Sequence, residues 1–593
     1  MRKSMLAALL LASLLPAAAV AQRPSWPTLE RQLSEDRVPR DSALAELIAK
    51  NQEFSLLRPE EARDELPVPL WLRVLWRKAH PEGPYSGDDP TGGYPFVLKE
   101  LHEWMVSHPD LAKDSSGIQA LQAAAAVPRA TLSAGTNQRI SGAAFNPRSE
   151  SDIRVNYWEP QRIVAASNNI QSSGALAVFY SDDGGASWRQ TLLPLVQNAQ
   201  FHSDPAVDWT SDGTAWAVAI GIDPGERTLR LQAFQSADGG ATWTFDQTIS
   251  GEHRLADKQL IWTDHSNGSP HKDNLYVIWH NGPSVYVNRR VAATSAWEEP
   301  RQISGVETRG TGIGSDVKTN NLGHVFAFWP DTGSRNIFFA KSIDGGASWA
   351  RPSILGRTWG SFDLQIPAQG RRQALIYVTG GAFYRGPRKN MVYAAWTDLS
   401  GIQGCRTPLN EPRLDVNHPC QTRIFFSRST NGGRTWSAPR AINNAGTRND
   451  QFNPWLVVDE TSGALAIIYY DTVTEARVRT NVWAQASIDD GATWSAPFRV
   501  TTQSSLATGF SSDPNQYGDY NGLSGIAGTF FPSWTDRRAE GREQIWTAPL
   551  VLQVRRNRIA SAEPSPALAC LFRFLAVDEG WSVEEMLQPI CEG

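Results

Sequence analysis

The sequence predicts an all-β protein, a β-propeller of four-stranded blades, on three observations. An eight-residue turn motif occurs five times, beginning at Ser181, Ser236, Ser342, Ser429 and Ser487. These copies fit a repeat of about fifty residues, the size of one four-stranded blade. In addition, 47 glycines, 37 prolines and 23 tryptophans among 593 residues are typical of many short strands joined by turns.

The central copy of the motif, Ser342 to Trp349, reads Ser-Ile-Asp-Gly-Gly-Ala-Ser-Trp and follows an apolar run. This order predicts strand, tight turn, strand, because glycine accepts positive φ and an Asp or Asn side chain can bond the turn amides. We expect the tryptophan to pack against the neighbouring repeat. The motif resembles the Asp box, or BNR repeat, of sialidase-like β-propellers. In that family these turns lie away from the active site, so the resemblance implies a structural role.

The spacing predicts seven blades, with six as the alternative because sialidases have six. Ser236 and Ser342 lie about two repeats apart, so a blade without the motif is expected between them, at residues 257–303. A further degenerate unit follows the last copy, from Gly518 to Ala548. A segment upstream of Gln138 is expected to complete that unit and close the ring, which removes the exposed sheet edges.

The ends of the chain differ from the repeats in residues 136–552. Residues 1–21 predict a signal peptide, with a basic start, an apolar run and the small residues Ala19-Val-Ala21. Export to a secreted or periplasmic location follows, with no transmembrane segment. Residues 22–125 predict a small helical region, for which a propeptide is the alternative, residues 126–135 a linker, and residues 553–593 a short helical tail.

Four cysteines in an exported chain favour disulfides. Of the three pairings, we prefer the two local ones, Cys405–Cys420 and Cys570–Cys591. A zinc site is not expected, because the sequence has neither a CxxC pattern nor a nearby pair of histidines.

The formal net charge of −5, with lysine and arginine spread along the chain, does not predict nucleic-acid binding. A glycan or glycoconjugate is the expected ligand, and the sequence does not indicate an oligomeric state. No cofactor is predicted, although a structural calcium ion is an open alternative.

Acidic residues are expected around the central channel, on the face opposite the turn motifs. The predicted innermost strands begin at Asp204, Asp257, Asp316, Asp363, Asn453 and Asp519. The predicted second strands end at Asn281, Asp331, Asp398, Asp471 and Asp536. Such carboxylates can bond the amides of the adjacent blade, which is a structural role. Alternatively, crowded carboxylates can act as general acid and base or hold a hard cation.

The candidate site residues come from these positions. The candidate catalytic residues are Tyr520, Asp519, Asp536, Asp257 and Asp204. The candidate substrate-binding residues are His202, Lys258, Arg537, Arg538, Asp316 and Trp534. Because the pKa of a free tyrosine is about 10, a Tyr520 nucleophile would need a base. Adjacent residues of a strand point to opposite sides, so Asp204 or Asp257 is a better candidate base than Asp519.

The resemblance to sialidases implies a tyrosine nucleophile assisted by a glutamate, an aspartate acid/base, and three arginines that bind the substrate carboxylate. The nearest match to their Phe/Tyr-Arg-Ile-Pro motif is Gln138-Arg-Ile-Ser141, which lacks the aromatic residue and the proline. The glutamate and the other two arginines have no matching positions, so the resemblance covers the scaffold and stops short of the active site. Three functions therefore stay open: a carbohydrate-active enzyme (a glycoside hydrolase or a lyase), a secreted binder of glycan or protein, and a structural factor of the cell envelope. The first two are preferred because aromatic residues at the strand ends could stack on sugar rings.

Overall fold

The computed structural model describes residues 129–555, except 144–145, 171, 197–198, 370–373, 385–389, 444–446, 474–475, 507–516 and 539–541, together with strands β1 (Arg37–Pro39) and β2 (Glu65–Pro67). The chain divides into two units, Ala130–Gln553 on one hand and Met1–Arg129 with Val554–Gly593 on the other. In the second of these, β1 and β2 pair antiparallel. The predicted signal peptide, the helices at both ends and the Cys570–Cys591 bridge lie outside the described residues.

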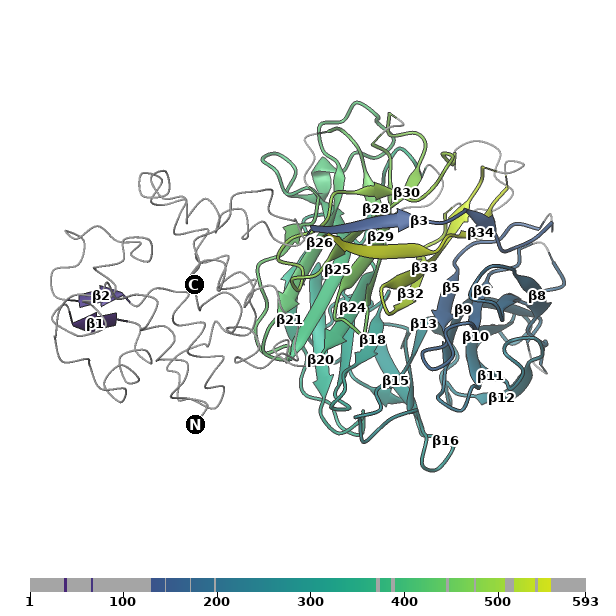
Figure 1. Cartoon of the computed structure of the whole chain (residues 1–593). Helices are drawn as coiled ribbons and strands as arrows, with labels where there is room; N and C mark the ends of the chain where they lie inside the picture. The colour runs from purple at the N-terminus through teal and green to yellow at the C-terminus, as the bar shows by residue number, and fades with distance from the viewer. Residues whose placement is uncertain are drawn as a thin grey trace, which may run out of the picture. The chain divides into compact units, whose positions relative to one another are not determined.

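The unit Ala130–Gln553 is a ring of seven antiparallel blades, which confirms the predicted number (Figure 1). The innermost strands of successive blades contact one another in order, and the innermost strand of blade 7 contacts that of blade 1. Buried apolar side chains fill the space between the blades. The ring is therefore closed by packing as well as by hydrogen bonds.

Each blade is an antiparallel sheet whose strands follow one another from the innermost outward. Blade 1 has β5 (Asp152–Val155), β6 (Ile163–Ser167), β7 (Ala177–Ser181) and β8 (Arg189–Leu192). Blade 2 has β9 (Phe201–Trp209), β10 (Ala215–Asp223), β11 (Thr228–Ser236) and β12 (Thr244–Thr248). Blade 3 has β13 (Ala256–Thr263), β14 (Leu275–Asn281), β15 (Ser284–Val291) and two short outer strands, β16 (Ala296–Trp297) and β17 (Arg301–Gln302). Blade 4 has β18 (Asp316–Thr319), β19 (Val325–Pro330), β20 (Asn336–Ser342) and β21 (Ser353–Arg357).

Blade 5 has β24 (Val378–Phe383), β25 (Met391–Leu399), β26 (Thr422–Ser429) and β27 (Arg440–Ala441). Blade 6 has β28 (Gln451–Val458), β29 (Leu465–Asp471), β30 (Asn481–Ser487) and β31 (Phe498–Arg499). Blade 7 has β32 (Gly522–Ile526), β33 (Thr529–Asp536), β34 (Gln544–Thr547) and β4 (Gln138–Arg139), and its sheet is extended by β35 (Leu550–Arg555) and β3 (Arg129–Ala134). A hairpin of β22 (Asp363–Leu364) and β23 (Ala374–Leu375) precedes blade 5, and one 3-10 turn (Pro408–Asn410) follows β25.

The last blade is completed by the start of the ring, as predicted. Strand β4 pairs with β34, with Arg139 opposite Trp546 and Gln138 opposite Thr547. The closing strand is thus Gln138–Arg139 itself, whereas the prediction placed it upstream of Gln138. In Figure 1 the blue β3 lies beside the yellow end of the ring, in the same sheet.

The predicted start of blade 5 at Asp363 is wrong. Asp363 belongs to the β22–β23 hairpin and is exposed, and β24 is the innermost strand of that blade. Strand β24 contains Gly380 and Gly381, where a Cβ atom would overlap Phe328 of blade 4 and Val458 of blade 6. The neighbouring blades approach so closely that glycine replaces the apolar residues by which a strand is recognised.

The five repeated turns have one hydrogen-bond pattern. In the central copy the Ser342 hydroxyl donates to Asp344 Oδ1 (2.7 Å), and the amides of Gly346 and Ser348 donate to Ser342 Oγ and Asp344 Oδ1 (2.8 and 2.9 Å). The other four copies repeat these bonds. Slight burial opposes the shift, but the serine hydroxyls lower the pKa of Asp344 to about 2.

The same turns join adjacent blades. Gly433 has φ +87°, and a Cβ atom there would overlap the ring of Phe339 in blade 4. Trp436, at the end of that copy, packs edge-on against Phe339 with ring centroids 5.2 Å apart. Trp494 packs in the same way on Phe426 of blade 5, at 5.2 Å. The motif is therefore a contact between blades, as expected for a structural role.

Replacing Asp344 by alanine is expected to lower the free energy of unfolding by about 1 kcal/mol, because the turn amides lose their acceptor. Any ligand binding on the opposite face should be unchanged. Asp344→Asn is the matched control, since Asn431 accepts the same amide bond in the fourth copy. Urea denaturation measures the change, and loss of binding with unchanged stability would contradict the structural role.

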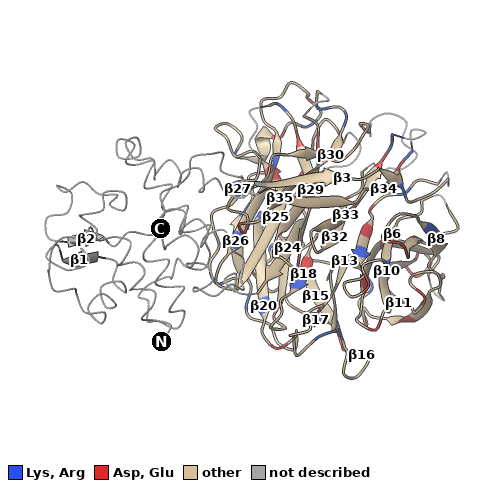
Figure 2. Cartoon of the chain, viewed as in Figure 1, with Lys and Arg blue, Asp and Glu red and all other residues tan. Residues whose placement is uncertain are grey.

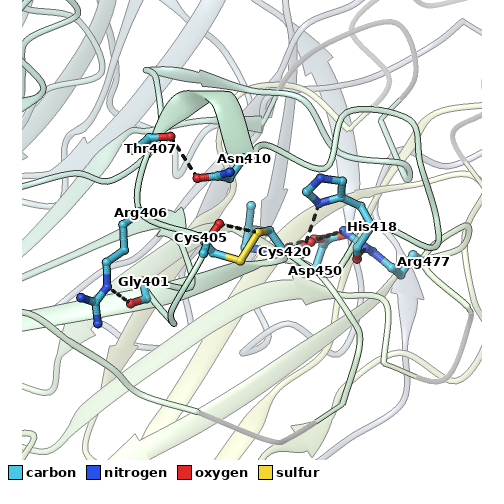
Figure 3. Close-up of a disulfide and its surroundings, with 11 residues drawn as sticks. Gly401, Cys405, Arg406, Thr407, Asn410, His418, Cys420, Asp450 and Arg477 are labelled. Atoms are coloured by element: carbon cyan, nitrogen blue, oxygen red, sulfur yellow. Dashed lines mark hydrogen bonds and ion pairs between the residues drawn. A yellow bond between two sulfur atoms is a disulfide. The ribbon is translucent and has the colours of Figure 1, made fainter.

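The predicted Cys405–Cys420 disulfide is confirmed (Figure 3). The disulfide closes a segment between β25 and β26. The Arg477 guanidinium, from the loop between β29 and β30, donates to two backbone oxygens of this segment, those of His418 (2.8 Å) and Cys420 (3.1 Å). Within the described residues no helix has the length and apolar character needed to cross a membrane.

Candidate functional site

The innermost strands begin on one face of the ring, which we call the strand-start face. The turn motifs follow the third strand of a blade, and the strands are antiparallel, so these motifs lie on the opposite face. At the strand starts the chain repeatedly adopts the left-handed conformation. The residues concerned are Glu150 (φ 54°), Asp204 (52°), Lys258 (55°), Gly314 (75°), Asn453 (48°) and Gly518 (73°).

Left-handed backbone is unfavourable for residues other than glycine, and such residues gather at functional sites. The pairing register shifts at Asp204 in β9, at Lys258 in β13 and at Asn453 in β28, as in a β-bulge. A bulge redirects a side chain, and here the redirected side chains of several blades meet.

The Lys258 cluster, formed by Lys258, Asp204, Asp519 and Glu150, is the centre of this arrangement. The Lys258 ammonium lies 2.7 Å from Asp204 Oδ2, 2.8 Å from Asp519 Oδ2 and 3.7 Å from Glu150 Oε1. The four residues come from blades 1, 2, 3 and 7. The carboxylate side chains are 5% exposed or less, and that of Lys258 is 11% exposed. Figure 2 shows basic and acidic positions meeting at β13.

The charges of the cluster hold one another in place. Burial alone would lower the pKa of Lys258, but the charges of Asp204 and Asp519 raise it well above its ordinary value. Burial would likewise raise the pKa of Asp204, but the Lys258 ammonium keeps it below its ordinary value. Both groups are therefore ionised at neutral pH, and neither changes its protonation state there.

A second set of contacts fixes the carboxylates. Asn168 donates to Glu150 Oε2 at 2.8 Å and accepts the backbone amide of Asp204 at 2.8 Å. The hydroxyl of Tyr377, which precedes β24, donates to Asp519 Oδ2 at 3.2 Å. The cluster is thus preorganised by residues of several blades.

Aromatic rings border the cluster. Tyr377 and Tyr520 lie nearly parallel with ring centroids 6.5 Å apart, and Trp455 is 6.2 Å from Tyr520. Burial raises the pKa of both tyrosines well above the ordinary value. The negative charge of Asp519 raises the pKa of Tyr377 further, and that of Asp204 raises the pKa of Tyr520 further. Both hydroxyls are therefore protonated near neutral pH.

Several buried polar atoms beside the cluster have no hydrogen-bond partner among the residues that the structure describes. They include the hydroxyl of Tyr520 and the side-chain oxygens of Asn453, Asn521 and Gln259. Buried polar groups in folded proteins are nearly always bonded, so a bond to water or to a ligand would stabilise each of these atoms.

The remaining predicted site residues lie apart from this centre. Asp257 is one-third exposed and faces His280, whose Nε2 is 3.8 Å from its carboxylate. His202 pairs with Gln232 (3.0 Å) rather than with Asp204, and burial lowers the pKa of His202 to about 4.

In blade 7, Asp536 binds groups of its own sheet end. It accepts from Trp534 Nε1 at 3.0 Å and from Arg538 Nη2 at 2.6 Å. Trp534 is completely buried, so it is not a platform for a sugar ring. Arg537 pairs with Glu543 at 3.2 Å.

Asp316 has the structural role that was one of the two expectations for these carboxylates. It pairs with Lys318 and accepts the Gly380 amide of blade 5 at 2.8 Å. Asp152 accepts the Val207 amide of blade 2 in the same way, at 3.0 Å. Inner-strand carboxylates of this type join adjacent blades.

The channel is filled below the strand-start face. The cations of Arg154 and Lys318 lie 5.8 and 4.6 Å from the centre of the Trp262 ring. The cavity that they line with Trp455 and Glu460 has a volume of only about 10 Å³. This is about the least space that one water molecule needs, so a ligand cannot pass through the ring at this level.

No group of three or more histidine, cysteine or acidic side chains in the described part of the chain is arranged to hold a metal ion. In the Lys258 cluster, the ammonium itself lies between the carboxylates, where a cation would bind. The calcium alternative therefore has no supporting site among these residues.

Sequence reasoning found Asp204, Lys258 and Asp519 but missed Glu150, Asn168 and Tyr377. The signal for Glu150 is its register, because Glu150, Asp204 and Lys258 follow one another at equal intervals of 54 residues. Tyr377 was missed because the innermost strand of blade 5 was misplaced.

Fold and site together define a seven-bladed β-propeller with a charged strand-start mouth above a filled channel. No family model and no curated protein matches the chain. Among solved structures it is similar to a lectin from Burkholderia pseudomallei (13% identity, 68% of this chain and 96% of that chain, TM-score 0.45). It is also similar to an α-L-arabinofuranosidase from Fusarium graminearum (11% identity, 58% of this chain and 91% of that chain, TM-score 0.39). A third similar structure is the NanB sialidase from Streptococcus pneumoniae (11% identity, 72% of this chain and 70% of that chain, TM-score 0.33).

The seven four-stranded blades themselves confirm the propeller scaffold that the turn motifs predict. At identities of 13% or less and TM-scores of 0.45 or less, these likenesses carry no argument about activity.

Proposed function

We propose that this protein is an exported glycan-binding propeller, secreted or periplasmic, that takes its ligand at the strand-start mouth beside the Lys258 cluster. The observation that carries this proposal is the set of buried polar atoms without a partner, on Tyr520, Asn453 and Asn521. A sugar hydroxyl both donates and accepts, so a hydroxyl-rich ligand matches one donor and two acceptors.

Binding is favoured over hydrolysis by the charges of the site. Hydrolysis of a glycosidic bond usually needs one carboxylic acid that is protonated at the working pH and a second carboxylate. In the Lys258 cluster the ammonium lowers the pKa of Asp204 and occupies the space between the carboxylates. Asp204 is therefore a fixed negative charge and not a poised acid.

A glycoside hydrolase is the second candidate, and one observation favours it. The Tyr377 hydroxyl donates to Asp519, a residue of another blade, at 3.2 Å. This is the pairing of tyrosine and carboxylate that a tyrosine nucleophile needs, with Tyr377 in the role that was predicted for Tyr520. Asp519 would then accept the phenolic proton as the Tyr377 oxygen bonds to the anomeric carbon and the glycosidic bond breaks, with water protonating the leaving aglycone oxygen.

Tyr520→Phe is expected to weaken binding of a ligand found on a glycan array by about two- to tenfold, the value of one hydrogen bond. Because the hydroxyl has no partner among the described residues, the melting temperature should be unchanged or higher. Tyr470→Phe is the matched control. Its hydroxyl donates to Thr535 O at 2.8 Å, so this variant should lose stability and keep binding.

Calorimetric titration with that glycan and thermal denaturation separate the outcomes. If Tyr520→Phe binds the glycan as tightly as the native protein, the ligand does not contact this hydroxyl and the proposed site is wrong. A chromogenic glycoside panel tests the second candidate, for which Tyr377→Phe should abolish turnover while binding is retained.

A further inference from the structure

A hollow lies on the strand-start face, at the seam of blades 6 and 7. It has a volume of about 520 Å³ and is lined by Arg479, Arg499, Gln503, Ser504, Leu506, Arg537 and Arg538. Arg479 precedes β30, Arg499 ends β31, and Arg537 and Arg538 follow β33. Each of these strand ends belongs to the strand-start face, so four guanidinium groups from two blades converge there. We call this hollow the arginine pocket.

Two of the four arginines are held rigidly. Arg538 donates to Asp536 Oδ2 through Nη2 and Nε (2.6 and 2.8 Å), and its guanidinium lies 4.6 Å from the centre of the Trp546 ring. Arg537 pairs with Glu543 (3.2 Å) and donates to the backbone oxygen of Leu506 (2.7 Å). Their positive charges are thus offset by two buried carboxylates, and their positions are fixed without a ligand.

The other two arginines have no such compensation. Within the part of the chain that the structure describes, neither Arg479 nor Arg499 lies within ion-pair distance of an acidic side chain. Arg479 is exposed, whereas Arg499 is half-buried and its Nε atom is buried without an acceptor. Among the described residues, four guanidinium groups against two carboxylates leave the arginine pocket with an excess of two positive charges.

We propose that the arginine pocket binds an oxyanion group, namely a sulfate, phosphate or carboxylate. Guanidinium groups match such anions with paired hydrogen bonds, and a partly enclosed site strengthens those bonds relative to water. Ser504 and Gln503 add neutral polar groups to the same wall. The sulfate or phosphate comes either from a free anion or from a substituent of a larger ligand on this face.

The arginine pocket is electrostatically opposite to the Lys258 cluster, where three carboxylates surround one ammonium. The strand-start face therefore carries two built sites of different charge. The oxyanion proposal does not depend on glycan binding at the mouth, because it concerns other residues and is tested with inorganic anions.

The test is calorimetric titration of the full chain with sodium sulfate and with sodium phosphate at low ionic strength. We expect the double variant Arg479→Gln/Arg499→Gln to bind each anion at least about tenfold more weakly, as for the loss of charged hydrogen bonds. The control is Arg189→Gln, which removes an exposed arginine in the strand that follows a turn motif on the opposite face. It removes one positive charge but should leave anion binding unchanged.

A sulfated disaccharide and its desulfated form distinguish the two sources of the anion. If the sulfated sugar binds more tightly than inorganic sulfate, and the double variant loses this difference, the arginine pocket binds a substituent of a larger ligand. If the two bind equally, the arginine pocket binds free anions. The proposal is overturned if neither sulfate, phosphate nor the sulfated sugar binds, or if the double variant binds them like the native chain. The melting temperature of the double variant without anions should equal that of the native chain, since both arginine side chains reach the surface of the pocket. This measurement shows that the fold is intact.

Discussion

Replacing Lys258 by methionine is expected to lower the free energy of unfolding at pH 7 by about 3–5 kcal/mol, as for other buried ion pairs that lose one partner. The variant would leave the carboxylates of Asp204, Asp519 and Glu150 buried together without the ammonium that lies between them. Methionine keeps much of the side-chain volume, so the loss reports charge rather than a cavity.

The loss should depend on pH. In the native protein the pKa of Asp204 is lowered, so its contribution to stability is complete above its unfolded-state pKa of about 3.9 and is lost only below that. The raised pKa of Lys258 contributes fully below its unfolded-state value of about 10.4 and is lost as the pH rises through the folded value. Both contributions are therefore present at pH 4.5 and at pH 7.

Without the ammonium, burial dominates and raises the pKa of the carboxylates, so the folded variant takes up protons as the pH falls. The deficit of Lys258→Met should thus be smaller at pH 4.5 than at pH 7, as measured by urea denaturation. Lys341→Met is the control, since Lys341 is half-buried beside Phe326 and has no acidic partner within ion-pair distance among the described residues. Equal deficits at both pH values, or a loss below about 1 kcal/mol, would contradict a charge-stabilised cluster.

The architecture was predictable because its signals are local and repeated. Each turn motif has a strand on either side, and five copies at intervals of 55, 106, 87 and 58 residues define most of the ring. The prediction failed at blade 5, where Gly380 and Gly381 replace apolar residues because Phe328 and Val458 press against the strand. A packing contact between distant segments removed the local signal there.

The candidate site was predictable only in part for a related reason. The register of the repeats places Asp204, Lys258 and Asp519 on one face, but it does not show which side chains a bulge redirects. His202 and Asp536 share that face and yet bind partners within their own blades. Contacts such as that of Tyr377 with Asp519 join residues 142 positions apart, and the sequence alone does not show them.

Replacing Arg477 by methionine is the second change expected to cost about 3–5 kcal/mol. Its side chain is 1% exposed and holds Asp450 with two bonds, from Nε (2.7 Å) and Nη2 (2.9 Å). It also donates to the backbone oxygens of His418 and Cys420, at the end of the disulfide-closed segment (Figure 3). Its removal would leave a buried carboxylate and two carbonyl groups without their strongest donor.

A double variant separates the charge from the hydrogen bonds. In Arg477→Met/Asp450→Asn the buried negative charge is gone, so this protein should be more stable than Arg477→Met alone. The remaining deficit then measures the bonds that hold the segment. We expect the Cys405–Cys420 bridge to persist in both variants, as shown by peptide mapping without reduction. If the double variant is less stable than Arg477→Met, the unpaired charge of Asp450 is not the source of the deficit, since the asparagine oxygen still accepts the Thr422 amide (3.1 Å).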